Sequence, residues 1–161
     1  MPARGDIVLA DTNVLVELVR IQQYKAVTTA FRFETAGKCI EEIGTGGKAR
    51  QKYVQYLRSR LVVHSVGSRE MAALHHHAAD AKWLDEGEKH LLAHAAGKQG
   101  AWWLCDPDIA ALRVARDLRI LDRTVALDAL LGIAGVRCTV RDNFTGKWLE
   151  KTRTKLLLGI I

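Results

Sequence analysis

Short, continuous apolar runs separated by helix-length segments constrain the fold of this chain most strongly. The clearest runs are residues 7–10 (IVLA), 61–66 (LVVHSV) and 101–105 (AWWLC), with weaker runs around 136–140 and 119–121. Continuous runs, in place of strict alternation between apolar and polar residues, are typical of strands buried on both faces. Because such strands occur in parallel sheets covered by helices, we predict an α/β fold: a parallel β-sheet flanked by helices on both faces.

The segments between these runs have the length and the apolar spacing of helices. A chain of 161 residues suits one sizeable core, so we expect a single domain over residues 1–161. The predicted helices are residues 13–24, 46–60, 67–83, 86–98, 107–118 and 124–135.

The charge and cysteine content narrow the functional classes. The formal net charge is +6, from 24 Lys and Arg against 18 Asp and Glu, which fits RNA or DNA as a partner and also fits a soluble basic surface. No apolar run approaches the roughly 20 residues of a membrane span. The N-terminus lacks a signal-peptide pattern, so we expect a cytoplasmic protein without membrane association. Cys39, Cys105 and Cys138 have no CxxC spacing, which indicates reduced, mostly buried thiols.

Polar residues stand where two of the predicted strands end. Asp11, Thr12 and Asn13 follow the first run, and Asp106 and Asp108 follow the run at 101–105. Ligands of parallel α/β sheets bind at the carboxyl ends of the strands. Carboxylates that converge there repel one another unless a cation lies among them, and Mg²⁺ and Mn²⁺ prefer carboxylate oxygens.

Helix capping is the alternative interpretation of each acid. Asp11 is a good N-cap for the first helix. Asp106 followed by Pro107 is a good helix start, with Asp at N-cap and Pro at the first helical position. Asp85 and Glu88 have capping-box spacing. Capping explains Asp106 but not Asp108, and only one residue of the trio at 11–13, so the set as a whole favours a metal site.

Three segments resemble PIN domains, in the order in which that family has them. They are IVLADTNVLVEL at 7–18, LDEGEKHLLAHAA at 84–96 and WWLCDPDIAALRVARDLRI at 102–120. With the helical connections between them, they cover residues 6–135. The resemblance implies a PIN-like fold and a metal-dependent nuclease that binds one or two Mg²⁺ or Mn²⁺ ions and hydrolyses phosphodiesters, usually in RNA. It also implies an antitoxin protein as a partner, since many PIN domains are toxins of toxin–antitoxin pairs.

The resemblance assigns roles position by position. Asp11 matches the first acid of the family, Asn13 the polar residue behind it, and Glu88 the acid of the GE stretch. Asp108 aligns with the late acid because the helix that follows is then in register, and Asp106 is the alternative.

The second acid of the family falls in IEEI at residues 40–43. We prefer Glu42, because Ile43 then takes the apolar position that follows this acid, with Glu41 as the alternative and Glu34 third. Asp11 would be the central metal ligand, and Glu42, Glu88 and Asp108 would bind directly or through water. Asn13 would orient a water or a carboxylate. The candidates for holding the RNA strand are Lys48, Arg50 and Arg113.

Three further points concern the competing function, a histidine pair and the end of the chain. A degenerate PIN-like module that binds nucleic acid or a protein partner without cleavage is the competing function. His90 and His94 have the i, i+4 spacing of a chelating pair, but no further motif of a zinc enzyme accompanies them. We expect the apolar end of the chain, residues 156–161, to pack on the core, with a homodimer or partner interface as the alternative.

Overall fold

A four-stranded, entirely parallel sheet forms the centre of the molecule, as the sequence predicts. The structure is a computed structural model that describes residues 1–45 and 47–161, apart from the side chains of residues 48 and 49. The strand order is β3-β2-β1-β4. The strands are β1 Ile7–Ala10, β2 Arg32–Ala36, β3 Val62–His64 and β4 Trp102–Cys105.

Helices connect the strands and continue beyond the last one. The α-helices are α1 Thr12–Arg20, α2 Tyr24–Ala30, α3 Gly37–Gly44, α4 Lys48–Arg58, α5 Ser68–His77, α6 Glu86–Gly97, α7 Ile109–Asp117, α8 Leu127–Ala134 and α9 Gly146–Leu157. Short 3₁₀ helices lie at η1 Ala79–Trp83, η2 Leu121–Arg123 and η3 Asp142–Phe144.

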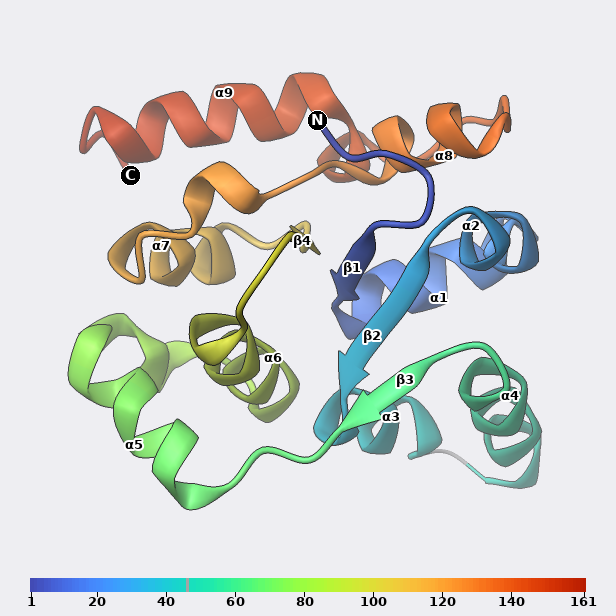
Figure 1. Cartoon of the computed structure of the whole chain (residues 1–161), viewed down its shortest axis with the longest axis horizontal. Helices are drawn as coiled ribbons and strands as arrows, with labels where there is room; N and C mark the ends of the chain where they lie inside the picture. Colours follow the sequence, from blue (N-terminus) through green and yellow to red (C-terminus); the bar gives the residue numbers. More distant parts are fainter. Residues whose placement is uncertain (46) are drawn as a thin grey trace.

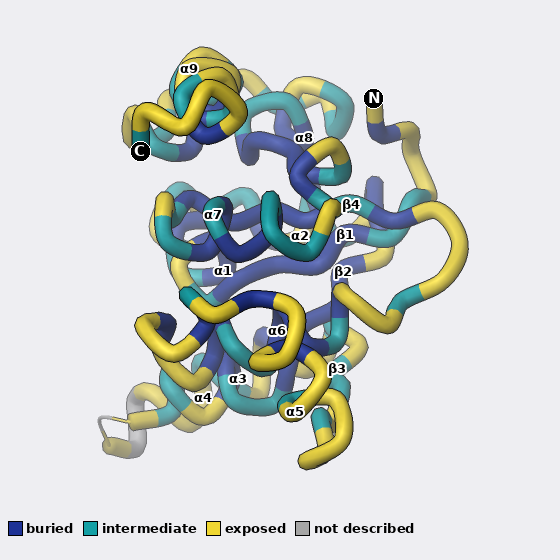
Figure 2. The backbone as a smooth tube through the Cα atoms, turned by 90° about the vertical axis from the view of Figure 1, so that its left-hand side faces the viewer, coloured by how far each residue is buried: buried dark blue, intermediate teal, exposed yellow. Residues whose placement is uncertain are grey.

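Each face of the sheet carries its own apolar layer. Leu9 and Leu104 pack with α5, α6 and α7 on one face, whereas Val8, Ala10 and Cys105 pack with α1, α2, α4 and α8 on the other. Figure 1 shows these two groups of helices on either side of the strands, and Figure 2 shows that β1 is buried between them. Alternate residues of one strand point to opposite faces, so both sets of side chains in a strand covered on both sides are usually apolar.

The strand β2 was absent from the sequence predictions, because its polar residues hide it. Its residues Glu34 and Thr35 are buried, at 3% and 0% exposure. Thr35 Oγ1 donates a hydrogen bond to the Ala10 carbonyl at 2.7 Å, and Lys98 Nζ lies 2.8 Å from a Glu34 carboxylate oxygen. Partners far away in the sequence therefore satisfy polar groups that look like loop residues locally.

The strands predicted around 119–121 and 136–140 are wrong, because both segments begin with the ends of helices. Arg119 has a positive φ of 60°, and the Ile120 N–H bonds the Ala115 carbonyl at 2.9 Å. Gly135 has a φ of 82°, and the Val136 N–H bonds the Leu131 carbonyl at 2.9 Å. A left-handed residue followed by such a bond is a common way to end a helix.

The predicted helices are present with shifted bounds. The segment 13–24 divides into α1 and the start of α2, because Gln22 adopts a positive φ of 58°. The segment 46–60 becomes α4, and its residue 46 lies outside the described residues. The helix α9 was not predicted; its buried positions Leu149, Thr152 and Leu156 follow helical spacing among polar neighbours.

The apolar end of the chain is only partly packed on the core. Leu156 is buried as expected, but Leu157, Leu158 and Ile160 are exposed.

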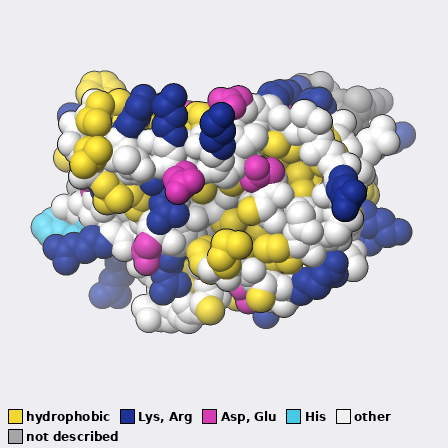
Figure 3. Space-filling view, turned by 90° about the horizontal axis from the view of Figure 1, so that it is seen from above, with side chains coloured by type: hydrophobic (Ala, Val, Ile, Leu, Met, Phe, Trp, Pro, Cys, Tyr) yellow, Lys and Arg dark blue, Asp and Glu magenta, His cyan; other side chains and the backbone are white. Residues whose placement is uncertain are grey.

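In the part of the chain that the structure describes, no helix has the length and apolarity needed to cross a membrane. Cys39 and Cys105 are buried free thiols, and Cys138 is exposed. Figure 3 shows more Lys and Arg than Asp and Glu on the face seen from above.

Candidate functional site

The first acid of the predicted site, Asp11, and the alternative late acid, Asp106, lie where the adjacent strands β1 and β4 end. β1 and β4 are paired through Ala10 and Cys105, and the Asp11 N–H donates to the Cys105 carbonyl at 3.3 Å. Asp11 and Asp106 therefore leave the sheet side by side. Both are buried, at 1% and 4% exposure. Two carboxylates so placed can ionise together only if another charge compensates them.

Asp11 takes the capping role that the sequence offered for it, and its carboxylate lies among other acids. It is the N-cap of α1, and its Oδ2 accepts a hydrogen bond from the Asn13 N–H at 2.9 Å. Burial, with a smaller contribution from the charges of Asp85 and Glu42, raises its pKa to about 6 against the lowering effect of that hydrogen bond. The carboxylate is therefore held rigidly among other acids.

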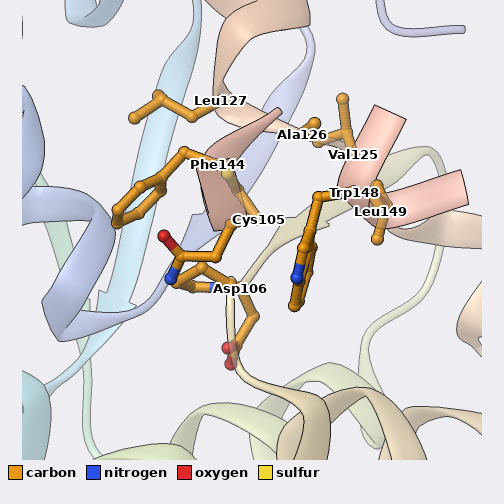
Figure 4. Close-up of a pocket in the computed structure, with 10 residues that line it drawn as sticks. Cys105, Asp106, Val125, Ala126, Leu127, Phe144, Trp148 and Leu149 are labelled. Atoms are coloured by element: carbon orange, nitrogen blue, oxygen red, sulfur yellow. The ribbon is translucent and has the colours of Figure 1, made fainter. Parts of the chain in front are cut away.

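Asp106 has a buried oxygen that no hydrogen bond satisfies. Its Oδ1 accepts the Asp108 N–H at 3.0 Å, but its Oδ2 is buried and has no hydrogen-bond partner. Burial raises its pKa well above the usual range, and the charges of Asp11 and Glu88 add to the effect. Figure 4 shows the carboxylate pointing away from Val125 and Leu127, apolar residues of a cavity of about 10 Å³ that leaves room for little more than one water molecule.

The prediction that Asp106 caps the following helix is wrong, because Asp108 does so. Asp108 is the N-cap of α7, and its Oδ1 accepts the N–H groups of Ala110 at 2.6 Å and Ala111 at 3.4 Å. Capping thus accounts for the acid that seemed to lack a reason. The carboxylate of Asp106, the alternative late acid, is the one that lies near Asp11 and Glu88.

Glu88 enters the same cluster from the first turn of α6. The expected capping box is present: Glu88 N–H donates to Asp85 Oδ1 at 2.8 Å, and Asp85 N–H donates to Glu88 Oε2 at 3.3 Å. Burial, together with the charges of Asp85, Asp108 and Asp11, raises the pKa of Glu88 to about 8. Glu88 is therefore close enough to Asp11 and Asp108 for their charges to raise its pKa.

Glu42, the preferred second acid, is oriented toward the cluster. Its Oε2 accepts from Thr12 Oγ1 at 2.9 Å, and its Oε1 accepts from the Gly87 N–H at 2.8 Å. A Cβ at position 87 would lie only 2.5 Å from Glu42 Oε2, so the carboxylate needs a glycine there. Glu41 is exposed and pairs with Lys38 at 2.6 Å. We call Asp11, Glu42, Asp85, Glu88, Asp106 and Asp108 the acidic cluster.

The remaining candidates lie around this cluster. Asn13 is exposed and contacts Asp11 through its backbone N–H. Arg50 is exposed on α4, and Arg113 is half-buried on α7. The side chain of Lys48 lies outside the described residues. Their roles toward RNA stay predictions.

The acidic cluster suits a hard divalent cation, although its carboxylates are not drawn tightly together. Asp11, Glu88 and Asp106 would supply oxygen ligands to such an ion, and the unsatisfied Oδ2 of Asp106 is the atom that most needs a positive partner. In the described part of the chain, the one group of three His, Cys, Asp or Glu side chains with all ligand atoms within 4.8 Å of one another lies elsewhere: Glu34, His64 and His94.

This second group was not foreseen from the sequence, although it could hold a metal ion. Glu34 is in β2, His64 ends β3 and His94 is in the middle of α6. Burial alone would raise the pKa of Glu34, but hydrogen bonds from Lys98 and His64 lower it. Burial and the neighbouring His64 lower the pKa of His94. Because β2 was not predicted, nothing in the sequence brought Glu34, His64 and His94 together. The i, i+4 spacing of His90 and His94 was the only sequence signal for a metal ligand among them.

Comparisons with known proteins leave the family open. No family model, no curated protein and no solved structure matches the chain. The resemblance to PIN domains therefore stands on the three sequence segments alone.

Proposed function

We propose that this protein is a PIN-like, metal-dependent endoribonuclease that uses Mg²⁺ or Mn²⁺ to hydrolyse phosphodiester bonds of RNA. The observation that carries the proposal is the buried, unpartnered Oδ2 of Asp106 in a cluster with Asp11 and Glu88. Burying such an oxygen without a partner costs free energy unless a cation occupies its vicinity. Three acids from distant parts of the chain share this arrangement, which single helix caps do not require.

The residues of the cluster divide the work. Asp11, Asp106 and Glu88 would hold the ion, with Asp108 near enough to interact through water. Glu42 holds the start of α1 against the start of α6 through Thr12 and Gly87, and so fixes the distance between Asp11 and Glu88. Asn13, exposed beside Asp11, would orient a water molecule or the scissile phosphate.

A bound divalent ion supplies charge neutralisation at the phosphoryl oxygens and a lowered pKa for a water molecule beside it. The chain itself contributes a set of carboxylates, of which Asp11, Glu88 and Asp106 are buried, and this negative charge would repel a phosphate in the absence of a cation. The net charge of +6 supports a polyanionic substrate, and contacts to phosphates by Lys and Arg give salt-dependent binding with little sequence preference. A toxin role, restrained by an antitoxin protein, belongs to the same proposal.

Cleavage of a labelled single-stranded RNA tests the proposal. We expect cleavage with Mn²⁺ or Mg²⁺, none with EDTA, and none for Asp11→Asn, which keeps a side chain able to cap α1. Asp122→Asn, at an exposed acid in η2, is the matched control and should cleave like the wild type. Full activity of Asp11→Asn would remove the acidic cluster from the reaction.

The competing function predicts a different outcome of the same experiment. If the wild type binds RNA but does not cleave it with either ion, the protein is a PIN-like binding module and not a nuclease. Electrophoretic mobility shifts on the same RNA measure this binding directly. A salt dependence of the binding then reports how many phosphates are contacted.

A further inference from the structure

Glu34, His64 and His94 form a compact group that the acidic cluster does not include. Their ligand atoms all lie within 4.8 Å of one another. The two imidazole rings are stacked, with centroids 4.0 Å apart and planes inclined by 19°. They come from two neighbouring strands and one helix, so the fold itself brings them together.

One ring nitrogen of this group lacks a partner. His64 Nε2 lies 2.8 Å from Glu34 Oε2, but His94 Nε2 lies 3.9 Å from the same oxygen, beyond hydrogen-bond distance. His94 Nε2 is buried and has no hydrogen-bond partner. A buried polar atom with no partner costs free energy, and a second ligand nitrogen and a carboxylate lie beside it.

The ammonium group of Lys98 supplies the positive charge beside Glu34 that a metal ion would otherwise supply. Its Nζ lies 2.8 Å from Glu34 Oε2, the oxygen that also contacts His64. Lys98 is the C-cap residue of α6, so its long side chain can swing away while the helix stays in place. The buried carboxylate thus has a positive partner in either state.

Solvent reaches the group from one side. A pocket of about 150 Å³ is lined by His64 together with Gly37, Lys38, Glu41, Ser65, Val66 and His90. His64 is only partly buried, which leaves a path for an ion from this pocket. The acidic cluster is distinct: Glu88 precedes His94 by six residues, or about 9 Å along α6 at 1.5 Å per residue.

We propose that Glu34, His64 and His94 form a second metal site, which binds Zn²⁺ or a similar transition-metal ion. Two imidazoles and one carboxylate suit such ions, whereas Mg²⁺ prefers oxygen ligands alone. The bound ion ties the edge strand β3 and the strand β2 to α6. This site does not depend on the proposed nuclease activity.

Zinc titration of the full chain, stripped with EDTA and followed by competition with a chromogenic chelator, tests this site. We expect one Zn²⁺ per chain and at least tenfold weaker binding for His64→Gln and for His94→Gln. Lys98→Met should bind Zn²⁺ more tightly, because it frees an oxygen of Glu34; a purely structural ion pair predicts no such gain. Asp11→Asn should bind Zn²⁺ like the wild type, which separates this test from that of the acidic cluster.

The exposed residues His75, His76 and His77 at the end of α5 are the obvious adventitious site. A variant with all three changed to Gln should keep the zinc, as should His90→Gln on α6. If the zinc is lost with the triple change, or is unaffected by both His64→Gln and His94→Gln, the proposal fails. Should those two variants fold poorly, X-ray absorption on the zinc-loaded triple variant decides: two imidazole ligands support the site, and none excludes it.

Discussion

The backbone N–H of Asp108 donates a hydrogen bond to Oδ1 of Asp106 at 3.0 Å, while Asp108 itself caps α7. One acid therefore holds the helix, and the other, aligned by the same loop, presents its second oxygen to the cluster. Because the two carboxylates differ in role, we expect replacement of Asp106 to affect cleavage and replacement of Asp108 to affect stability.

Asp106→Asn should abolish cleavage without lowering the melting temperature measured in EDTA. The change replaces a buried carboxyl whose Oδ2 has no hydrogen-bond partner and whose pKa is raised by burial and by neighbouring carboxylates, and the amide oxygen can still accept from the Asp108 N–H, so the fold loses little. Thermal unfolding by circular dichroism and RNA cleavage with Mn²⁺ measure the two effects. A melting temperature several degrees below that of the wild type would show that Asp106 stabilises the fold.

Asp108→Ala should instead destabilise the protein by about 1 kcal/mol, the usual cost of losing a helix N-cap. Asp108→Asn keeps an acceptor for the N–H groups of Ala110 and Ala111 and should be close to wild type in stability. Denaturant unfolding of both variants gives the comparison. Equal stability of the Ala and Asn variants would contradict the capping role.

Glu42→Gln should reduce cleavage strongly, whereas Glu41→Gln should have little effect. Glu42 joins Thr12 to Gly87 beside Asp11, but Glu41 is exposed and pairs only with Lys38 among the described contacts. The two variants differ by one position on α3 and are therefore matched controls for each other. The reverse order of activities would show that the helix presents the wrong acid to the site.

Gly87→Ala should lower cleavage on the order of 10-fold to 100-fold, the effect of misplacing a site residue by about 1 Å. The new Cβ would displace the Glu42 carboxylate, which is the end of a flexible side chain, so the fold should survive. Gly97→Ala, at the other end of α6, meets no atom within 4 Å and is the control. Unchanged activity in Gly87→Ala would show that the position of Glu42 does not matter.

Glu17 should make stability depend on pH in the acid range. Its buried carboxylate accepts hydrogen bonds from Arg20 at 2.6 and 2.8 Å and lies 3.4 Å from Arg141, and the Arg20 bonds lower its pKa below the ordinary 4.5. A carboxyl whose pKa is lowered in the folded state stabilises the fold at pH values above its pKa in the unfolded state. This stabilisation is lost as the pH falls through the pKa of the folded state. Glu17→Gln should therefore cost about 1 kcal/mol at pH 7.

Denaturant midpoints at pH 7 and at decreasing pH measure the effect of Glu17→Gln. The difference from the wild type should shrink as the pH falls below 4.5. Glu150→Gln, at an exposed acid on α9, should show no such dependence. A difference that stays constant down to acid pH would mean that packing, and not charge, explains the loss.

The sequence predicts the parts of this fold whose local pattern agrees with their environment. β1 and β4 are apolar throughout, so their burial and the position of Asp11 and Asp106 at their ends follow directly. β2 fails that test, because Glu34 becomes acceptable in a buried strand only through Lys98 and His64, which are remote in the sequence.

The same limit applies to the two sites. Most acids of the cluster follow a strand or lie at the start of a helix, whereas Glu42 lies near the end of α3 and was assigned through the resemblance to PIN domains. Capping geometry distinguishes Asp106 from Asp108 only once the helix start is known. The group of Glu34, His64 and His94 has no local pattern, since each residue comes from a different element. Its discovery needs the strand order β3-β2 and the packing of α6 on the sheet.

The close approach of Gly87 to Glu42 sets a rule for how this chain can diverge. A side chain at position 87 would displace the Glu42 carboxylate from its present position, so a descendant that loses the glycine is better accommodated by a shorter residue at position 42. Substitutions at these two positions, 45 residues apart, should therefore arise as pairs.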